Sequence, residues 1–583
     1  DEVAALSEHD RLRVVSGSIF SKIVRSTMYA LMPEPDRRAA HAKLASSVTG
    51  PQRLWHRAMA TPGLSASLAD SLADVRVDDP AEAAMLLERA AYLTVHPGLR
   101  GSRFLEAARQ AWYAGRPGWA RLMLSRAAGA DIGRRALLHG EIELRDGDPA
   151  VATHELATAA EHLVDPGPAL RLSGEARRLC GDVSGYRAMA RTVRCDHFTG
   201  LTATFEGRHT DAVEPLRRVV RAGNEARDVA SAVWAAEAAF ALGRGEMAYE
   251  CASAAVGRAR LSGQKSALPW ALVQLSLAAI VLDRHKVAVA ASTEGLAASA
   301  AQRNTWTEHL SLLGLSAALR GDQSAESTLA LAAAGIAERG LGRPSAIAAW
   351  AEACLDLAAD RPADALGRLE TMAAGVSGAQ PAIQVLATPQ LVEAAVQVDQ
   401  PDRARQALQI FDAWVHAGAS SAWLALSHRC HGLLDPDNAE HHFETAVDLH
   451  RKAGAAMELA RTQMAYANRL RRQRRSGTAR ALFRDALRVF ETLGADGWSE
   501  RARAGLRATG ETVATPETSL AGLTPQQTEI SRLVAVGETN KEIARRLVIS
   551  HRTVDHHLRN IFTALGVRSR VELTRRVTGL ETH

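Results

Sequence analysis

The 583-residue chain has few cysteines, few aromatic side chains and no long hydrophobic run. Its five cysteines are scattered and form no C-x-x-C pair, which argues against a disulfide framework or a zinc ribbon and fits a reducing cytosol. No run of about 18 apolar residues occurs, so we expect no transmembrane segment and no membrane partner. The chain starts at Asp1 without a signal-like hydrophobic stretch, so we expect a fragment that lacks its natural start. The cysteine usage predicts a cytoplasmic location.

Signatures of catalysis and of ligand binding are also lacking. No G-x-x-x-x-G-K-[ST] motif occurs, and in the G-Q-K-S stretch at Gly263 a glutamine separates glycine from lysine in a predicted turn between helices. His428 and His431 can share a helix face, but Cys430 between them would point away, so ordinary repeat helices are preferred over a metal site. With no Ser/His/Asp or paired-carboxylate set, we expect no enzymatic activity and no cofactor.

Alanine, leucine and arginine are abundant instead, and this composition favours helix because these side chains lose little conformational entropy there. A chain of this length is too long for one core and should divide into several units. The expected fold class is therefore all-α with several domains.

The positive charge is confined to one end of the chain. Between Leu523 and Val577 there are 10 Lys and Arg residues against five acidic ones, which accounts for the whole net charge of +5. The remaining 60 basic and 60 acidic residues cancel. A basic excess in one small unit is typical of a module that binds a polyanion.

The middle of the chain repeats a pattern of helix, short polar turn and helix. From Leu242 onward the turns fall roughly 36–41 residues apart, which is the range of helical-hairpin repeats. One hairpin cannot bury its apolar face alone, so neighbours must stack into a solenoid, which resembles the tetratricopeptide class. Boundaries between Glu161 and Cys195 stay open. The predicted turns begin at Ala114, Arg145, Glu206, Leu242, Leu282, Arg320, Ala359, Val398 and Arg474.

Four domain ranges follow from these patterns. Residues 1–60 form a distinct helical segment, and residues 61–506 form the repeat solenoid. Thr, Gly and Pro replace the apolar periodicity over 507–522, which predicts a linker, and residues 523–583 form a terminal domain. The cationic run R-L-R-R-Q-R-R-S at Arg469 is expected to be a solvated helix end, with non-specific contact to nucleic acid as the alternative.

The terminal domain carries start and stop signals for four short helices. Thr524 with Pro525 begins the first, which Gly537 ends, and Thr539 with Glu542 forms a capping box for the second. Ser550 caps the third, Gly566 ends it, and Ser569 with Glu572 opens the last, expected through Val577. A three- or four-residue turn between the second and third helices predicts a helix-turn-helix arrangement.

The third helix has two different faces. Five apolar residues lie on one side at 100° per residue: Val554, Leu558, Ile561, Phe562 and Leu565. Arg552, His556, Arg559 and Thr563 lie opposite, with Asp555 on the flank. A helix that presents cations and hydrogen-bonding groups outward suits the major groove of DNA, although a plain bundle with a solvated face is the simpler alternative.

The sequence from Leu523 to Leu573 closely resembles the LuxR-type DNA-binding domain. The matching landmarks are L-T at Leu523, N-K-E-I-A at Asn540, R-T-V at Arg552, and L-G-V-R-S-R at Leu565. One departure is Gln527, where the family usually carries glutamate. The resemblance implies double-stranded DNA as the partner.

The resemblance also assigns roles by position. It places Asp555, His556 and Arg559 where the family contacts bases, and Asn540 and Ser569 where it has donors or caps. The last helix resembles the family's dimer surface, which implies a homodimer on DNA. The positions expected near phosphates are Lys541, Arg552, Thr553, Arg568 and Arg570.

Asp555 is unusual because an acidic side chain near DNA repels phosphate. It is tolerable if it accepts from a donor such as cytosine N4. Alternatively it orients a neighbouring arginine or histidine, and the sequence does not choose between these roles.

The stretch from Ile19, IFSKIVRSTMYALMPEPDRRAAHAKLA, resembles the winged-helix end of the nucleotide-binding module in large ATP-binding regulators of the LuxR family. In those proteins a P-loop ATPase core precedes it, and helical repeats and a LuxR domain follow. Ser21 stands where that group commonly has histidine, and no nucleotide site is carried over. We expect either a piece of a larger regulator or a member that lost the module.

Together these features predict a transcription regulator, expected to be an activator, whose solenoid senses a small-molecule or protein effector and controls the DNA-binding head. RNA polymerase is a further candidate partner. The competing interpretations are a passive scaffold, a repeat-based adaptor whose LuxR-like end binds protein, and a fragment of a signalling ATPase.

Overall fold

The computed structural model describes residues 29–193, 195–375, 380–511, 523, 525–547, 549–567 and 569–581. These residues form helices and connecting turns, with no strand among them, which confirms the expected all-α class. The chain divides into two compact units, one up to Gly505 and the other from Leu506. Each unit is described separately below.

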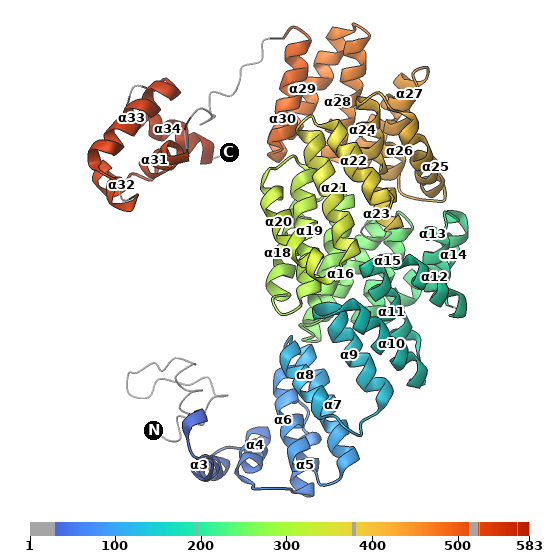
Figure 1. Ribbon diagram of the computed structural model, residues 1–583, viewed down its shortest axis with the longest axis vertical. Helices are drawn as coiled ribbons and strands as arrows, with labels where there is room; N and C mark the ends of the chain where they lie inside the picture. Colours follow the sequence, from blue (N-terminus) through green and yellow to red (C-terminus); the bar gives the residue numbers. More distant parts are fainter. Residues whose placement is uncertain are drawn as a thin grey trace. The chain divides into compact units, whose positions relative to one another are not determined.

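The first unit is a succession of antiparallel helices from α3 to α30 (Figure 1). Their bounds are α3 Glu34–Ser47, α4 Gly50–Ala60, α5 Ala66–Ala73, α6 Pro80–Leu93, α7 Pro97–Tyr113, α8 Pro117–Arg126, α9 Ile132–Asp146, α10 Pro149–His162, α11 Gly167–Cys180, α12 Val183–Thr192, α13 Asp196–Phe205, α14 His209–Glu225, α15 Val229–Ala241, α16 Gly245–Leu261, α17 Leu268–Val281, α18 His285–Ala298, α19 Arg303–Leu319, α20 Ser324–Arg339, α21 Gly342–Ala358, α22 Pro362–Ala373, α23 Pro381–Leu386, α24 Thr388–Gln397, α25 Asp402–His416, α26 Ser421–Leu434, α27 Ala439–Ala453, α28 Ala456–Arg472, α29 Ser476–Leu493 and α30 Asp496–Ala508.

All nine turns expected from the sequence separate two helices, which confirms the hairpin repeat. Most share one geometry, in which the second residue after the helix adopts a positive φ. Glycine occupies this position in several turns, such as Gly243 with φ 69°, while Asp283 and Asp360 occupy it at 61° and 60°. The next residue then donates back into the helix, as the Arg244 N–H does to the Ala239 carbonyl at 3.0 Å. Glycine and aspartate recur here because they tolerate the left-handed conformation.

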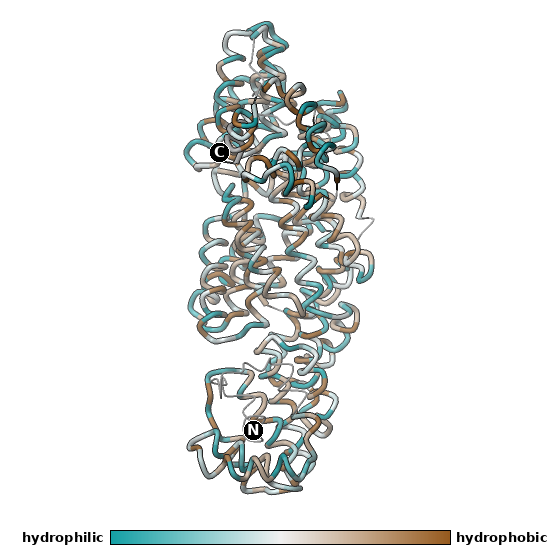
Figure 2. The backbone as a smooth tube through the Cα atoms, turned by 90° about the vertical axis from the view of Figure 1, so that its left-hand side faces the viewer, coloured by the Kyte–Doolittle hydropathy of each residue, from teal (hydrophilic) through white to brown (hydrophobic). Residues whose placement is uncertain are grey.

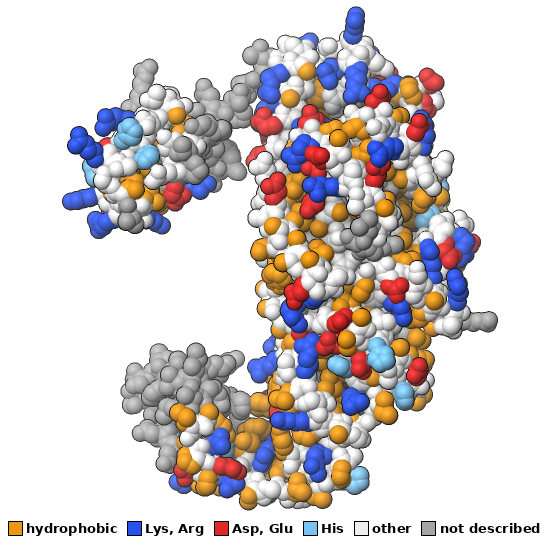
Figure 3. Space-filling model, in the orientation of Figure 1, with side chains coloured by type: hydrophobic (Ala, Val, Ile, Leu, Met, Phe, Trp, Pro, Cys, Tyr) orange, Lys and Arg blue, Asp and Glu red, His pale blue; other side chains and the backbone are white. Residues whose placement is uncertain are grey.

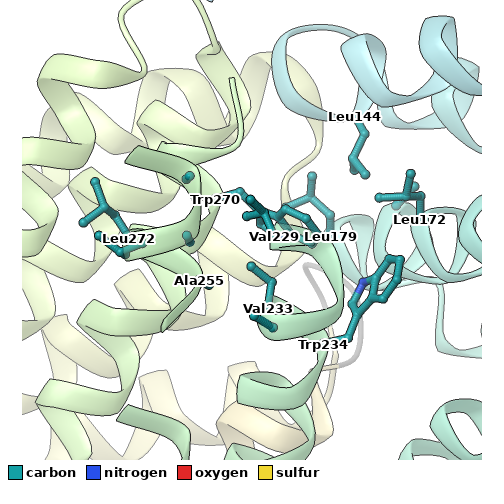
Figure 4. Packing of buried hydrophobic residues seen from close by; sticks show 14 of the residues in the cluster. Leu144, Leu172, Leu179, Val229, Val233, Trp234, Ala255, Trp270 and Leu272 are labelled. Atoms are coloured by element: carbon teal, nitrogen blue, oxygen red, sulfur yellow. The ribbon is translucent and has the colours of Figure 1, made fainter. Parts of the chain in front are cut away.

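Hydrophobic and hydrophilic residues interleave along the helices, so each helix buries one stripe against its neighbours (Figure 2). Leu366, Leu369 and Phe411 belong to such stripes and are buried. Figure 4 shows one layer of the core, where Leu179, Val233 and Trp270 come from α11, α15 and α17. Alanines between these larger side chains let the helices approach closely.

Helices about ten positions apart in the chain also touch, which the sequence did not indicate. Helix α9 contacts α19, α11 contacts α21, and α13 contacts α23. The hairpins therefore wind so that one turn of the superhelix packs on the next. The solenoid also contains ion pairs of buried arginines, Arg145–Glu175 at 2.6 Å and Arg461 with the partly buried Glu393 at 2.8 Å.

Carbonyl groups at helix ends take part in this stacking. The last carbonyls of an α-helix have no partner within the helix and need another donor. The Trp498 indole N–H donates to the Leu319 carbonyl at 3.1 Å, and the Trp414 indole donates to Ala241 at 2.8 Å. Leu319 and Ala241 are the last residues of α19 and α15. Donors from a later superhelical turn thus satisfy the ends of helices in an earlier one.

Several expected features fall at the limits of what the structure describes. Helix α30 runs to Ala508, which is two residues into the predicted linker. Residues 512–522 of that linker lie outside the described residues. Ser21 and Thr524 lie outside them as well. In the described part of the N-terminal segment, α3 follows Pro33. The G-Q-K-S stretch forms a turn between α16 and α17, not a strand-to-helix loop.

The described residues include no cluster of three or more His, Cys, Asp or Glu side chains placed to hold a metal ion. Cys430 is buried, and the flanking His428 and His431 contact His442 and Asp412 instead. None of the helices described here combines the length and apolar character that crossing a membrane requires.

Replacing Gly497 with alanine tests the stacking of superhelical turns. A β-carbon there would lie 2.9 Å from the Gly321 carbonyl oxygen, which belongs to the backbone and cannot move alone. We expect Gly497→Ala to destabilise the chain by about 1–3 kcal/mol. Gly477, also the second residue of its helix, has nothing within 4 Å, so Gly477→Ala should stabilise by about 0.5–1 kcal/mol. Urea unfolding measures both, and equal effects would contradict the close packing.

Acid should destabilise the solenoid through buried histidines. Burial lowers the pKa of His309 to about 4, below the value of about 6.5 for an exposed histidine. As the pH falls below about 6.5, His309 binds a proton in the unfolded chain but stays neutral in the folded chain. The free energy of unfolding therefore decreases. At pH 5 this costs about 2 kcal/mol for His309. Thermal unfolding from pH 7 to 5 should show a smaller decrease for His309→Gln than for the wild type, and His162→Gln, at an exposed position, should match the wild type. Identical pH dependence in all three chains would contradict this role.

Candidate nucleic-acid interface

The second unit contains four short helices around one small core. They are α31 Pro525–Ala535, α32 Asn540–Arg546, α33 His551–Leu565 and α34 Arg570–Glu581. Ile530, Ile543, Val554, Ile561 and Leu573 are each completely shielded from solvent and come from all four helices. The arrangement confirms the expected four helices, and α34 continues past Val577, where the sequence pattern ended it.

The helix boundaries follow the capping signals in the sequence. Gly537 ends α31 with φ 91°, and the Glu542 carboxylate accepts from the Thr539 N–H and hydroxyl, each at 2.7 Å. These bonds lower the pKa of Glu542. The Ser550 hydroxyl accepts from the Thr553 N–H at 3.1 Å to begin α33, and Gly566 ends it. Four residues separate α32 from α33, which is the predicted helix-turn-helix.

Helix α33 has one buried face and one exposed face. Val554, Leu558, Ile561 and Leu565 are buried, and Phe562 is partly buried. Arg552, His556, Arg559 and Thr563 are all exposed, as predicted. In Figure 3, Lys, Arg and His side chains gather on the visible face of this unit. The packing of the apolar face therefore fixes which side chains point to solvent.

Three of the predicted site residues form an internal network. The Asn540 amide donates to the Asp555 carboxylate at 2.6 Å, and its oxygen accepts from the Arg570 guanidinium at 2.7 Å. Arg570 also donates to the Glu538 carbonyl, and His551 lies 3.3 Å from the other Asp555 oxygen. Asp555 thus has two donors within the protein, Asn540 and His551. The network ties α32, α33 and α34 together.

Three further predicted residues, Lys541, Thr553 and Ser569, are described by the structure. Lys541 is exposed at the start of α32, and the Thr553 and Ser550 hydroxyls are 2.7 Å apart. The Ser569 hydroxyl accepts from the Glu572 N–H at 3.2 Å, so it caps α34 as expected. Arg568 lies outside the described residues.

Two contributors were missed by sequence reasoning. His551 lies beside Asp555, and its i,i+4 spacing on a helix was a signal that could have indicated this. Glu538 pairs with Arg546 through its carboxylate and accepts from Arg570 through its carbonyl. A backbone acceptor leaves no mark in the sequence, so that contact was not predictable.

Comparison with known proteins agrees with this geometry. The family described as bacterial regulatory proteins, luxR family, matches residues 521–577. An HTH-type transcriptional regulator of Mycobacterium tuberculosis is 45% identical over 58 residues, which is 10% of this chain and 7% of that protein. The nitrate/nitrite response regulator protein NarL of Escherichia coli is 42% identical over 59 residues, 10% of this chain and 27% of that one. This chain thus spans less than a third of the length of either relative.

Solved structures of low sequence identity align with much of the chain. The APC/C hetero-tetramer Cut9–Hcn1 is 13% identical, with 86% of this chain and 98% of that one covered and a TM-score of 0.34. A Rap protein complexed with competence and sporulation factor is 11% identical, with 70% and 100% covered and a TM-score of 0.28.

Three observations agree on one assignment: the helix-turn-helix geometry, the buried and exposed faces of α33, and the family match over residues 521–577. The C-terminal unit is a DNA-binding helix-turn-helix domain of the LuxR family of bacterial regulatory proteins.

Proposed function

We propose that the chain is a sequence-specific transcription regulator, an activator, in which the repeat region responds to an effector and controls the C-terminal head. The observation that supports this most is the exposed face of α33. Arg552, His556 and Arg559 lie on it while the opposite face is buried in the core. A rigid helix with outward cations and hydrogen-bonding groups is what readout of the major groove requires.

The exposed residues divide by the role we propose for them. His556 and Arg559 lie along the exposed face of α33 and read base edges. Arg552 and Thr553 at the start of α33, and Lys541 at the start of α32, contact phosphates, and Arg568 is proposed to do so by its position in the motif. Helix N-termini favour phosphate because their free N–H groups and dipole attract anions. Binding should therefore weaken steeply with salt.

The network of Asn540, Asp555 and Arg570 has a different role in this proposal. It holds α32, α33 and α34 in the orientation that binding needs, and Ser569 caps α34. Each head can bind one half-site of an operator, so binding two half-sites requires two copies. We therefore propose a homodimer on DNA, with α34 as the surface between the copies.

For the repeat region we propose a regulatory role without enzymatic activity. An effector shifts the population between a state in which the solenoid hinders pairing of the heads and one that allows it. The DNA-bound dimer then recruits RNA polymerase, and the whole process takes place in the cytoplasm.

Substitutions on the exposed face should separate base readout from phosphate contact. We expect Arg559→Ala to cost about 1–3 kcal/mol on an operator selected from a random DNA pool, and to cost less on scrambled DNA. Arg552→Ala should weaken binding to both by similar amounts and reduce the salt dependence by about one phosphate contact. Fluorescence-anisotropy titrations at several salt concentrations measure this. Equal losses for Arg559→Ala on both duplexes would remove its base-reading role, and a chain without any DNA binding would favour a protein-binding adaptor.

Substitution of Arg570 should act on stability instead. Arg570→Met removes the donors to Asn540 and to the Glu538 carbonyl and leaves these acceptors unsatisfied, at about 1–3 kcal/mol. Amide hydrogen exchange in α31–α34 should speed up, whereas Arg552→Met, at an exposed position, should leave it unchanged. Reduced DNA binding by Arg570→Met with unchanged exchange would show that Arg570 contacts DNA directly.

A further inference from the structure

A cleft in the solenoid combines features of a binding site that the proposed DNA-binding role does not use. It has a volume of about 320 Å³ and lies among α11, α13, α14 and α15. Val219, Ala222 and Trp234 form an apolar part of its wall, and Arg171, His197 and Ser231 supply polar groups. A volume near 300 Å³ is the lower end of the range for small-molecule sites.

Arg171 is a cation without an acidic partner among the described residues. Its guanidinium carbon lies 4.1 Å from the centre of the Trp234 ring, and its Nε is buried without a hydrogen-bond acceptor. Figure 4 shows the Trp234 side chain on the side of the core nearest Leu172 of α11, the helix that carries Arg171. Stacking on the indole holds the planar guanidinium in place and leaves its donors free for a ligand.

Two further groups in the cleft make no hydrogen bond with the described residues. His197 is 2% exposed, and neither ring nitrogen has a hydrogen-bond partner there, although Nε2 lies 3.6 Å from the Glu237 carboxylate. Burial lowers the pKa of His197 to about 4, so its ring is neutral near pH 7 and offers one donor and one acceptor. Helix α13 begins here at Asp196, after the N-cap residue Cys195, and no described side chain caps it. A free helix N-terminus favours an anion.

The acidic groups nearby are already engaged. Asp196 forms two bonds with Arg218, at 2.7 and 2.9 Å, and Asp228 accepts from the Ser231 N–H at 2.7 Å. Asp165 accepts from the Gly167 N–H at 3.0 Å. Burial lowers the pKa of Arg171, and the nearby Cys195, Asp165 and Asp228 offset this only in part. Among the described residues, no acidic group forms an ion pair with Arg171, so its donors are available in the cleft.

We propose that this cleft binds a small organic anion, with the anionic group on Arg171 and the start of α13 and an apolar or aromatic body against Val219, Ala222 and Trp234. The planar fork of arginine fits carboxylate and phosphate alike. The assignment of this cleft as the effector pocket of the regulator rests on the proposed function. Binding of the ligand itself is measured without DNA.

Isothermal titration of the full chain tests the proposal with four probes at matched ionic strength. Sodium benzoate and phenyl phosphate carry the two anionic groups on the same ring, benzyl alcohol is neutral, and inorganic phosphate lacks the apolar body. We expect binding of at least one aromatic anion, with benzyl alcohol and inorganic phosphate about tenfold weaker or more. The stronger aromatic anion identifies the preferred group. Failure of both aromatic anions to bind at about 10 mM, a concentration equivalent to roughly 3 kcal/mol of affinity, overturns the proposal.

Substitutions locate the site. Arg171→Met should weaken binding of the preferred probe about tenfold or more, and Arg171→Lys, which keeps the charge but loses the planar fork, should also weaken it. Arg217→Met removes the same charge from α14 outside the cleft and should change affinity less than about twofold. Unchanged affinity in both Arg171 variants overturns the proposal. A chain that binds DNA but neither aromatic anion would overturn this inference alone and leave the proposed function intact.

Discussion

The burial of one face of α33 determines what the C-terminal unit can present to a duplex. Val554, Leu558, Ile561 and Leu565 pack against the other three helices, so the rotation of α33 about its own axis is fixed. Because side chains on a helix keep their angular spacing, the exposed positions of Arg552, His556 and Arg559 follow from that packing. The network centred on Asn540 then fixes the orientation of α33 relative to α32 and α34.

The solenoid is stabilised by different contacts. Its hairpins bury apolar stripes between neighbours. Its helix-end carbonyls need hydrogen-bond donors and its buried charges need opposite charges, because packing removes both from water. Donors such as Trp498 and Trp414 reach across from later helices, and Arg145 and Arg461 find carboxylates in the interior. These polar groups are matched within the protein, whereas the proposed anion site uses Arg171 and His197, whose buried nitrogens include some without a hydrogen-bond partner among the described residues.

The sequence predicted features that depend on local chemistry. Turn residues such as Gly243 and Asp283 adopt a left-handed conformation, and Ser550 and Gly566 bound α33 where the spacing placed them. Contacts between distant segments were not predictable. Gly497 lies close to Gly321 because of how the repeats wind, which the periodicity of the sequence does not encode. Arg570 bonds to the Glu538 carbonyl, a backbone group that every residue has. Asp555 shows the limit most directly, because only the structure reveals Asn540 as its donor.

The most direct test of the central claim asks which face of the C-terminal unit touches DNA. A photoreactive benzophenone side chain is placed at His556 on α33 or at Arg532 on α31, both of them exposed, and the full chain is irradiated with a selected duplex. We expect a covalent protein–DNA product from position 556 and little from position 532. A product from position 532 with none from position 556 would contradict it.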